Sequence, residues 1–241
     1  QGRYSVAGQM LPEDICLVVD DVANKDTRLK RVFAKNGVLP AKGKASVEVG
    51  KTVIKGSDGE ISIMVVEGPS ERHSSTNKPI GILLITGSQI NRDLIRGTEV
   101  DLTIEVSESR DVTISAYLNG TGQEFSQVFK GTDRQVDTRM LASDVLSLES
   151  KIQDEIQEAS SNGNHDSAQG LERLLSQVQG LISEVGSLAP DDVTDDRFKL
   201  EDRKRKIAQD VFELTASKRV DAAKIAYAEA KEAVSALVSE S

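Results

Sequence analysis

Aromatic residues are scarce in this chain: they make up 3% of its 241 residues, and tryptophan is absent. A hydrophobic content of 38% is ordinary for a folded protein, so the core has to be built from Val, Ile, Leu and Ala. Few rings are available for stacking on nucleic-acid bases, and a net charge of −9 opposes binding to a polyanion. We therefore expect no nucleic-acid partner.

Cysteine and long apolar runs are also lacking. The single cysteine, Cys16, has no partner for an internal disulfide, which favours a reducing, cytoplasmic location. It stands in the apolar run 15–19 and is expected to be a small core residue rather than a nucleophile. No apolar run reaches the ~18 residues of a membrane span, and no signal peptide is recognisable. We expect no membrane partner, and we expect a piece of a longer protein because the chain does not begin with Met.

Motifs for catalysis, metal binding or phosphate binding are not found. His73 and His165 are the only histidines, and neither has a Cys or a second His at ligand spacing. The glycines at 81, 87 and 97 are too far apart for a phosphate loop, and there is no Gly-x-Ser-x-Gly elbow. The prediction is no catalytic residue, no metal and no enzyme, with an unrecognised active site as the weakest alternative.

The composition changes near residue 132. Residues 1–132 hold 14 of the 18 glycines and four of the five prolines, with 16 basic and 17 acidic residues. Residues 133–241 hold four glycines and one proline, with 14 basic and 22 acidic residues. Turn-forming residues punctuate the first part and are rare in the second. We predict two domains, 1–132 made of strands and 133–241 made of helices.

Apolar residues alternate with polar ones along 99–106 and again along 112–118, and the polar run 107–111 lies between them. This period of two predicts a hairpin with one solvated face. Further strands are predicted at 15–19, 29–34, 45–49, 61–67, 81–85 and 124–129. Seven or eight short antiparallel strands favour a β-sandwich, or else a barrel.

Apolar residues at helical spacing predict about three helices after the strands, which makes the fold class α+β. The first begins after Asp137 and ends at the break 160–166, the second covers 167–185, and the third runs from 194 to 238. The charged run 202–206 is expected on a solvated helix face. Near the C-terminus, alanines at 222, 226, 230 and 233 would allow close helix packing, including a homodimer through these helices.

Four blocks of the first part occur in an order that is familiar from one protein family: 34–40 (AKNGVLP), 61–68 (ISIMVVEG), 77–87 (NKPIGILLITG) and 96–116 (RGTEVDLTIEVSESRDVTISA). They resemble the substrate-binding region of the 70-kDa heat-shock chaperones. The chain departs from the family at several places. Val18-Val19-Asp20 replaces Gly-Ile-Glu, Val47 replaces a Phe, and 109–111 replaces an Asp-Gly turn. The resemblance is therefore to a divergent member.

In that family a β-sandwich holds an extended apolar peptide and a helical lid closes over it. The resemblance implies a chaperone function with unfolded polypeptides as partners, and an ATPase domain, with its ATP and Mg²⁺, outside these residues. A J-domain co-chaperone and a nucleotide-exchange factor are further implied partners. No cofactor is expected in this part of the protein. The alternative function is an adaptor that docks one specific protein through its strands or helices.

The resemblance also assigns roles to individual residues. It implies a lid contact for Arg96, for which a solvated loop arginine is the alternative. The peptide channel is implied to be lined by Val19, Val22, Val47, Ile61, Ile63 and Val100. For each of these six, the alternative is a plain place in the hydrophobic core.

Overall fold

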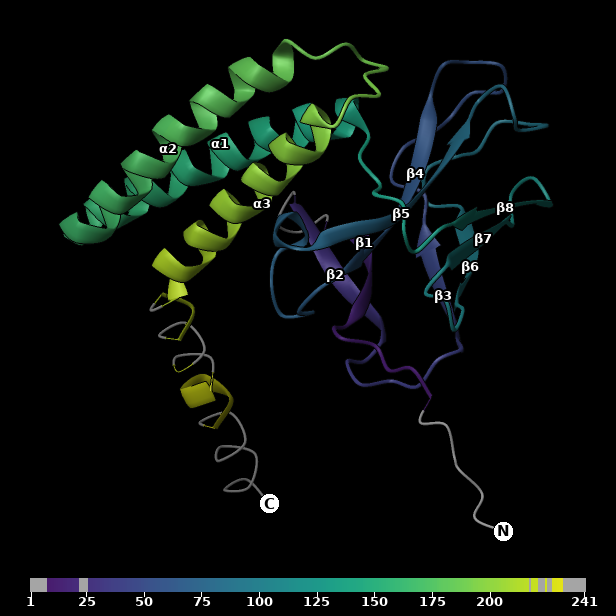
Figure 1. Ribbon diagram of the computed structural model, residues 1–241, viewed down its shortest axis with the longest axis horizontal. Helices are drawn as coiled ribbons and strands as arrows, with labels where there is room; N and C mark the ends of the chain where they lie inside the picture. Colours follow the sequence, from purple (N-terminus) through teal and green to yellow (C-terminus); the bar gives the residue numbers. More distant parts are fainter. Residues whose placement is uncertain (1–7, 22–25, 217, 221–223, 225–226, 232–241) are drawn as a thin grey trace, which may run out of the picture. The chain divides into compact units, whose positions relative to one another are not determined.

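The structure is a computed structural model that describes residues 8–21, 26–216, 218–220, 224 and 227–231 (Figure 1). It divides into two compact units, Gln1–Asp137 and Thr138–Ser241. This division lies a few residues beyond the change in composition at residue 132. Val22, one of the expected channel residues, falls outside the described residues.

The first unit contains eight described strands in two four-stranded antiparallel sheets (Figure 1). The first sheet has the order β2-β1-β4-β5, formed by β1 (Ile15–Asp21), β2 (Asp26–Phe33), β4 (Glu60–Glu67) and β5 (Lys78–Thr86). The second has the order β3-β6-β7-β8, formed by β3 (Ala41–Glu48), β6 (Glu99–Val106), β7 (Val112–Leu118) and β8 (Gln123–Phe129). The expectation of seven or eight antiparallel strands followed by helices is confirmed.

Strand β3 begins earlier than the sequence pattern predicts. It pairs with β6 over its whole length, from Ala41 opposite Val106 to Glu48 opposite Glu99. The first four residues include Gly43 and two lysines and have little intrinsic strand propensity. Pairing with β6 supplies their backbone hydrogen bonds, so the neighbouring strand and not the local sequence determines where β3 starts.

Buried aliphatic side chains from both sheets enter one hydrophobic core. Phe129, at 4% exposed, is the only aromatic residue among the described side chains that are buried. The largest members on the two sheets include Ile15, Leu17, Ile85, Leu102, Ile104 and Ile114. The expectation of an aliphatic core is confirmed.

The turn between β6 and β7 forms at residues 107–111, as predicted. The Ser107 N–H donates to the Asp111 carbonyl over 2.9 Å, and the Arg110 N–H donates to the Ser107 carbonyl over 2.9 Å. Arg110 has a φ of 66°, which is costly for a residue with a side chain. Its guanidinium forms an ion pair with Glu67 of β4, which offsets part of that cost.

Three α-helices follow among the described residues: α1 (Thr138–Ser161), α2 (His165–Gly186) and α3 (Asp196–Leu214). Within this unit α1 packs against α2, and α3 contacts both. The buried faces carry the expected apolar residues, among them Leu141, Val145 and Ile152 on α1 and Leu171, Val178 and Leu181 on α2. Asn164 caps α2 by accepting the Ser167 N–H over 3.3 Å, which explains the predicted break.

The helix predicted from 194 to 238 is interrupted, because α3 begins at Asp196 and ends at Leu214, and residues 232–238 of the predicted range lie outside the described residues. Thr215 follows with a non-helical conformation, and its hydroxyl donates to the Val211 carbonyl over 2.9 Å. A threonine side chain that bonds the preceding turn competes with continuation of the helix. Helical backbone is found again at 216, 218–220, 224 and 227–231. Of the alanine stripe, Ala230 is described, and Ala222, Ala226 and Ala233 lie outside the described residues.

Candidate functional site

A groove of about 1050 Å³ opens within the strand unit. Residues of β1, β2 and β4 from one sheet and of β3 and β6 from the other line it, together with residues 49–51 and 96–97. Ligand sites commonly span about 300–1,000 Å³, so this groove can take a polypeptide side chain with its backbone. A second pocket, between α1, α2 and the end of α3, has about 80 Å³ and falls far below that range.

Five of the six expected channel residues line this one groove: Val19, Val47, Ile61, Ile63 and Val100. Val100 is 1% exposed and Ile63 is 6% exposed, so both also belong to the hydrophobic core. Val19, Val47 and Ile61 are half-buried and pack against that core. The same residues can therefore line a channel and belong to the hydrophobic core, because the apolar wall of the groove is part of that core.

Strand geometry explains why these side chains meet. Ile61 and Ile63 are two residues apart on β4 and therefore face the same side of the first sheet. Val47 and Val100 stand directly opposite each other in the pairing of β3 with β6. Val19 lies on β1, the neighbour of β4 in the first sheet. The groove thus collects inward-facing aliphatic residues from both sheets.

Charged residues surround this apolar surface in equal numbers of each sign. The cations are Arg28, Lys30, Lys51 and Arg96, and the carboxylates are Asp20, Glu48, Glu60 and Glu99. The Lys30 ammonium donates to the Ser46 carbonyl over 3.3 Å, and the Ser46 hydroxyl donates to Glu99 over 2.6 Å. These bonds connect β2 to β3 and β3 to β6, so they help to hold the walls of the groove together.

Arg96 lies at the groove with an exposed side chain. Its backbone N–H donates to the Thr52 hydroxyl over 3.1 Å. Val49 pairs with Gly97 and Thr98 on one side of this contact, and Val53 pairs with Leu94 on the other. The segments 50–52 and 95–97 therefore face each other at the rim. The expected contact of Arg96 with a helical lid stays a prediction.

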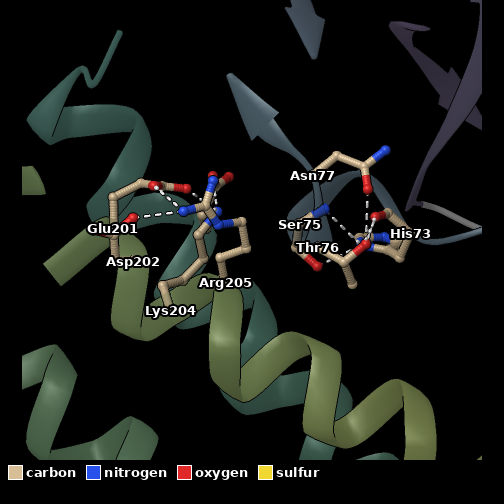
Figure 2. Close-up of polar contacts among 9 residues, drawn as sticks. His73, Ser75, Thr76, Asn77, Glu201, Asp202, Lys204 and Arg205 are labelled. Atoms are coloured by element: carbon tan, nitrogen blue, oxygen red, sulfur yellow. Dashed lines mark hydrogen bonds and ion pairs between the residues drawn. The ribbon is translucent and has the colours of Figure 1, made fainter. Parts of the chain in front are cut away.

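His73 is better connected than its loop sequence suggests (Figure 2). Its Nδ1 lies 2.7 Å from the Ser75 hydroxyl and accepts the Ser75 N–H over 3.2 Å, while its Nε2 lies 2.9 Å from Asp26 Oδ1. The Ser74 and Thr27 hydroxyls are also hydrogen-bonded, at 2.6 Å. Asp26 and Thr27 begin β2, so these contacts attach that strand to the segment before β5. No local sequence signal could reveal them, because 47 residues separate the partners.

The charged run 202–206 does not lie wholly on a solvated face, which corrects the expectation. Lys204 and Glu201 lie together on α3 (Figure 2), and their side chains are 3% and 4% exposed. The Lys204 ammonium is 3.6 Å from Asp144 of α1 and 3.8 Å from Glu201. Arg205 pairs with Asp202 at 2.5 Å. A buried ammonium persists because carboxylates from two helices surround it.

Cys16 is fully buried, as expected for a small core residue. Burial, reinforced by the nearby Asp14 carboxylate, raises the pKa of its thiol to about 11. Since the thiolate is the nucleophilic form, this environment disfavours reactivity.

Within the described ranges, no group of three or more His, Cys, Asp and Glu side chains is arranged to hold a metal ion. No helix in that part of the chain combines the length and apolarity needed to cross a membrane.

Comparison with known proteins does not assign the chain to a family, because no family model and no curated protein matches it.

Proposed function

We propose that the strand unit binds extended apolar segments of unfolded polypeptides, as the substrate-binding part of a chaperone similar to the 70-kDa heat-shock family. In this proposal the two sheets form a sandwich whose open end is the groove. The observation that carries it is the convergence of Val19, Val47, Ile61, Ile63 and Val100 on one groove of about 1050 Å³. The resemblance alone implies these residues, and they come from four different strands.

The lining suits such a ligand physically. An extended chain offers backbone hydrogen-bonding groups on both sides and one side chain toward an apolar floor. Full burial of a Leu or Ile side chain contributes about 1.5–3 kcal/mol. The half-buried surfaces of Val19, Val47 and Ile61 are available to provide that contact. Mixed charges around the groove keep the rest of the ligand solvated.

The rest of the proposal follows the resemblance. The helical unit acts as a lid that Arg96 contacts, and an ATPase domain outside these residues drives release of the ligand. That domain would bind ATP and Mg²⁺ and would bring the J-domain and nucleotide-exchange partners. The strand unit itself needs no cofactor for peptide binding.

The test is the binding of a fluorescently labelled Leu-rich heptapeptide, measured by anisotropy, to the chain and to Ile61→Asp. A carboxylate at this half-buried position places a charge against the apolar ligand, so we expect affinity to fall at least tenfold. Val128→Asp is the matched control, since Val128 is 55% exposed on β8 and does not line the groove. Thermal melting of each variant is recorded in parallel.

Unchanged peptide affinity in Ile61→Asp would contradict the proposal, because the groove would then not be the binding site. Early melting of that variant would show that Ile61 is required for the core, and Val19→Asp, at another half-buried groove position, would then repeat the test. Binding of a single partner protein, with no binding to a panel of unrelated apolar peptides, would favour the adaptor function instead.

A further inference from the structure

Three Asn-Gly pairs with an exposed asparagine occur in this chain, at 36–37, 119–120 and 162–163. An asparagine before glycine can lose its side-chain amide without an enzyme, because a glycine has no Cβ to keep its backbone nitrogen away from the neighbouring amide carbon. A hydrogen bond that holds this nitrogen has to be broken before it can react. Since exposure does not separate the three pairs, their backbone hydrogen bonds decide between them.

The glycine N–H is held by a hydrogen bond in two of the three pairs. Gly37 donates to the Ala34 carbonyl over 3.0 Å, and Gly163 donates to the Ser160 carbonyl over 3.1 Å. The Gly120 N–H makes no hydrogen bond with any residue that the structure describes. Gly120 is exposed, so its nitrogen is accessible to water and free to react.

The turn between β7 and β8 is closed without the Gly120 N–H. The Thr121 and Gly122 N–H groups both donate to the Leu118 carbonyl, over 3.1 Å and 2.8 Å. A reaction at the Gly120 nitrogen therefore does not require these two hydrogen bonds to break first.

Asn119 is hydrogen-bonded to two acidic residues of β6. Its side-chain Nδ2 donates to the Asp101 carboxylate over 3.2 Å, and its backbone N–H donates to the Glu99 carbonyl over 3.2 Å. An ionised carboxyl group has no proton to donate. If the amide of Asn119 became a carboxylate, its hydrogen bond to Asp101 would become a contact between like charges.

We propose that Asn119 is a site of spontaneous deamidation, and that Asp101 makes the product less stable than the parent chain. The Gly120 nitrogen attacks the Asn119 side-chain carbon and forms a C–N bond. The bond from that carbon to the amide nitrogen breaks, and ammonia leaves with the Gly120 proton. Water then opens the cyclic imide to aspartate or isoaspartate, so the chain gains one negative charge. This inference does not rest on the proposed peptide binding.

The free nitrogen sets the size of the preference. In the folded chain Asn119 should react roughly two- to tenfold faster than Asn36 or Asn162, the factor that corresponds to the net strength of one hydrogen bond. Unfolding in urea removes the hydrogen bonds of Gly37 and Gly163, so the three rates should then become similar.

The experiment incubates the whole chain in mildly alkaline buffer, with and without denaturing urea. Proteolysis and mass spectrometry measure the extent of deamidation at each of the three asparagines over time. Asn119→Gln is the matched variant, because it keeps an amide but moves the amide carbon away from the Gly120 nitrogen. It should remove the fastest phase of ammonia release from the folded chain.

A second measurement tests the product. Asn119→Asp should unfold at a lower urea concentration than the unmodified chain at low salt, and adding Asp101→Asn should restore most of the loss. The difference should shrink at 1 M salt, where the Debye length is about 3 Å. Asn36→Asp is the control, since Asn36 is exposed and its side chain makes no hydrogen bond with a described residue.

Equal rates at the three sites in the folded chain, or a faster reaction at Asn36 or Asn162, would contradict the assignment of the site. A preference for Asn119 that persists unchanged in urea would assign it to the local sequence and would also overturn the inference. An Asn119→Asp variant as stable as the unmodified chain would contradict the effect of Asp101. None of these results bears on peptide binding by the groove.

Discussion

Enlarging the side chain at position 47 is expected to tighten peptide binding. Val47 is half-buried, lines the groove and stands opposite Val100 in the pairing of β3 with β6. A valine covers little of a groove of about 1050 Å³, so a small aliphatic ligand side chain leaves space unfilled. Val47→Phe places a larger apolar surface on the same wall without adding a polar atom.

The size of the effect follows from the apolar area covered. A phenylalanine side chain can bury about 150–250 Å², and a quarter of that, about 40–60 Å², is a moderate figure for new contact with a ligand. At about 25 cal/mol per Å² this contributes about 1–1.5 kcal/mol. The dissociation constant of a Leu-rich heptapeptide should therefore fall about five- to tenfold.

The assay is fluorescence anisotropy with the labelled heptapeptide, and thermal melting verifies that the fold is kept. Val128→Phe is the control, since it adds the same ring at an exposed position of β8 away from the groove. Unchanged or weaker binding by Val47→Phe, with an unchanged melting temperature, would refute the reasoning. Sub-micromolar binding by the unmodified chain would also contradict the idea that the groove is loosely filled at Val47.

Three further predictions concern stability and reactivity. Lys204→Met should destabilise the helical unit by up to about 3 kcal/mol, because the buried Glu201 and the Asp144 carboxylate lose the Lys204 ammonium and Arg205, at 3.9 Å, compensates Glu201 only in part. Adding Glu201→Leu should restore most of that loss; urea unfolding followed at 222 nm tests this, and a double variant as unstable as the single one contradicts it. The Cys16 thiol, with its pKa raised to about 11, should not react with a thiol reagent at pH 8 until urea unfolds the chain, so rapid labelling of the native protein would be inconsistent with its burial. Burial alone raises the pKa of Asp14, but hydrogen bonds from Ser70 and Lys35 outweigh this and hold it below 3.8. Its ionised form therefore stabilises the fold above pH 3.8, the benefit is lost as pH falls through the lower folded-state pKa, and Asp14→Asn should show a shallower loss of stability under acid titration.

The hairpin of β6 and β7 shows what local pattern can predict. Its two strands have the bounds expected from alternation, and the turn forms at the polar run between them. Both strands pair with a neighbour in sequence, and each has one buried face, so a period of two is sufficient to identify them. The same holds for the helix faces of α1 and α2, whose apolar spacing matches their buried residues.

Prediction fails where a distant partner decides the outcome. β3 begins at Ala41 because β6 pairs with it, although its first residues have weak strand propensity. Lys204 is buried because Asp144 of another helix lies within 3.6 Å of its ammonium. His73 binds Asp26 across the strand unit. Each partner lies far away in the chain, so no window of local sequence contains the information.

The sequence by itself determines the kinds and order of the elements and the aliphatic character of the core. It also indicates, through resemblance, a set of apolar residues that could form a channel. Only the tertiary structure decides that Val19, Val47, Ile61, Ile63 and Val100 line one groove. The reason is physical: periodicity specifies which face of a strand is apolar, whereas strand pairing and packing specify which faces meet.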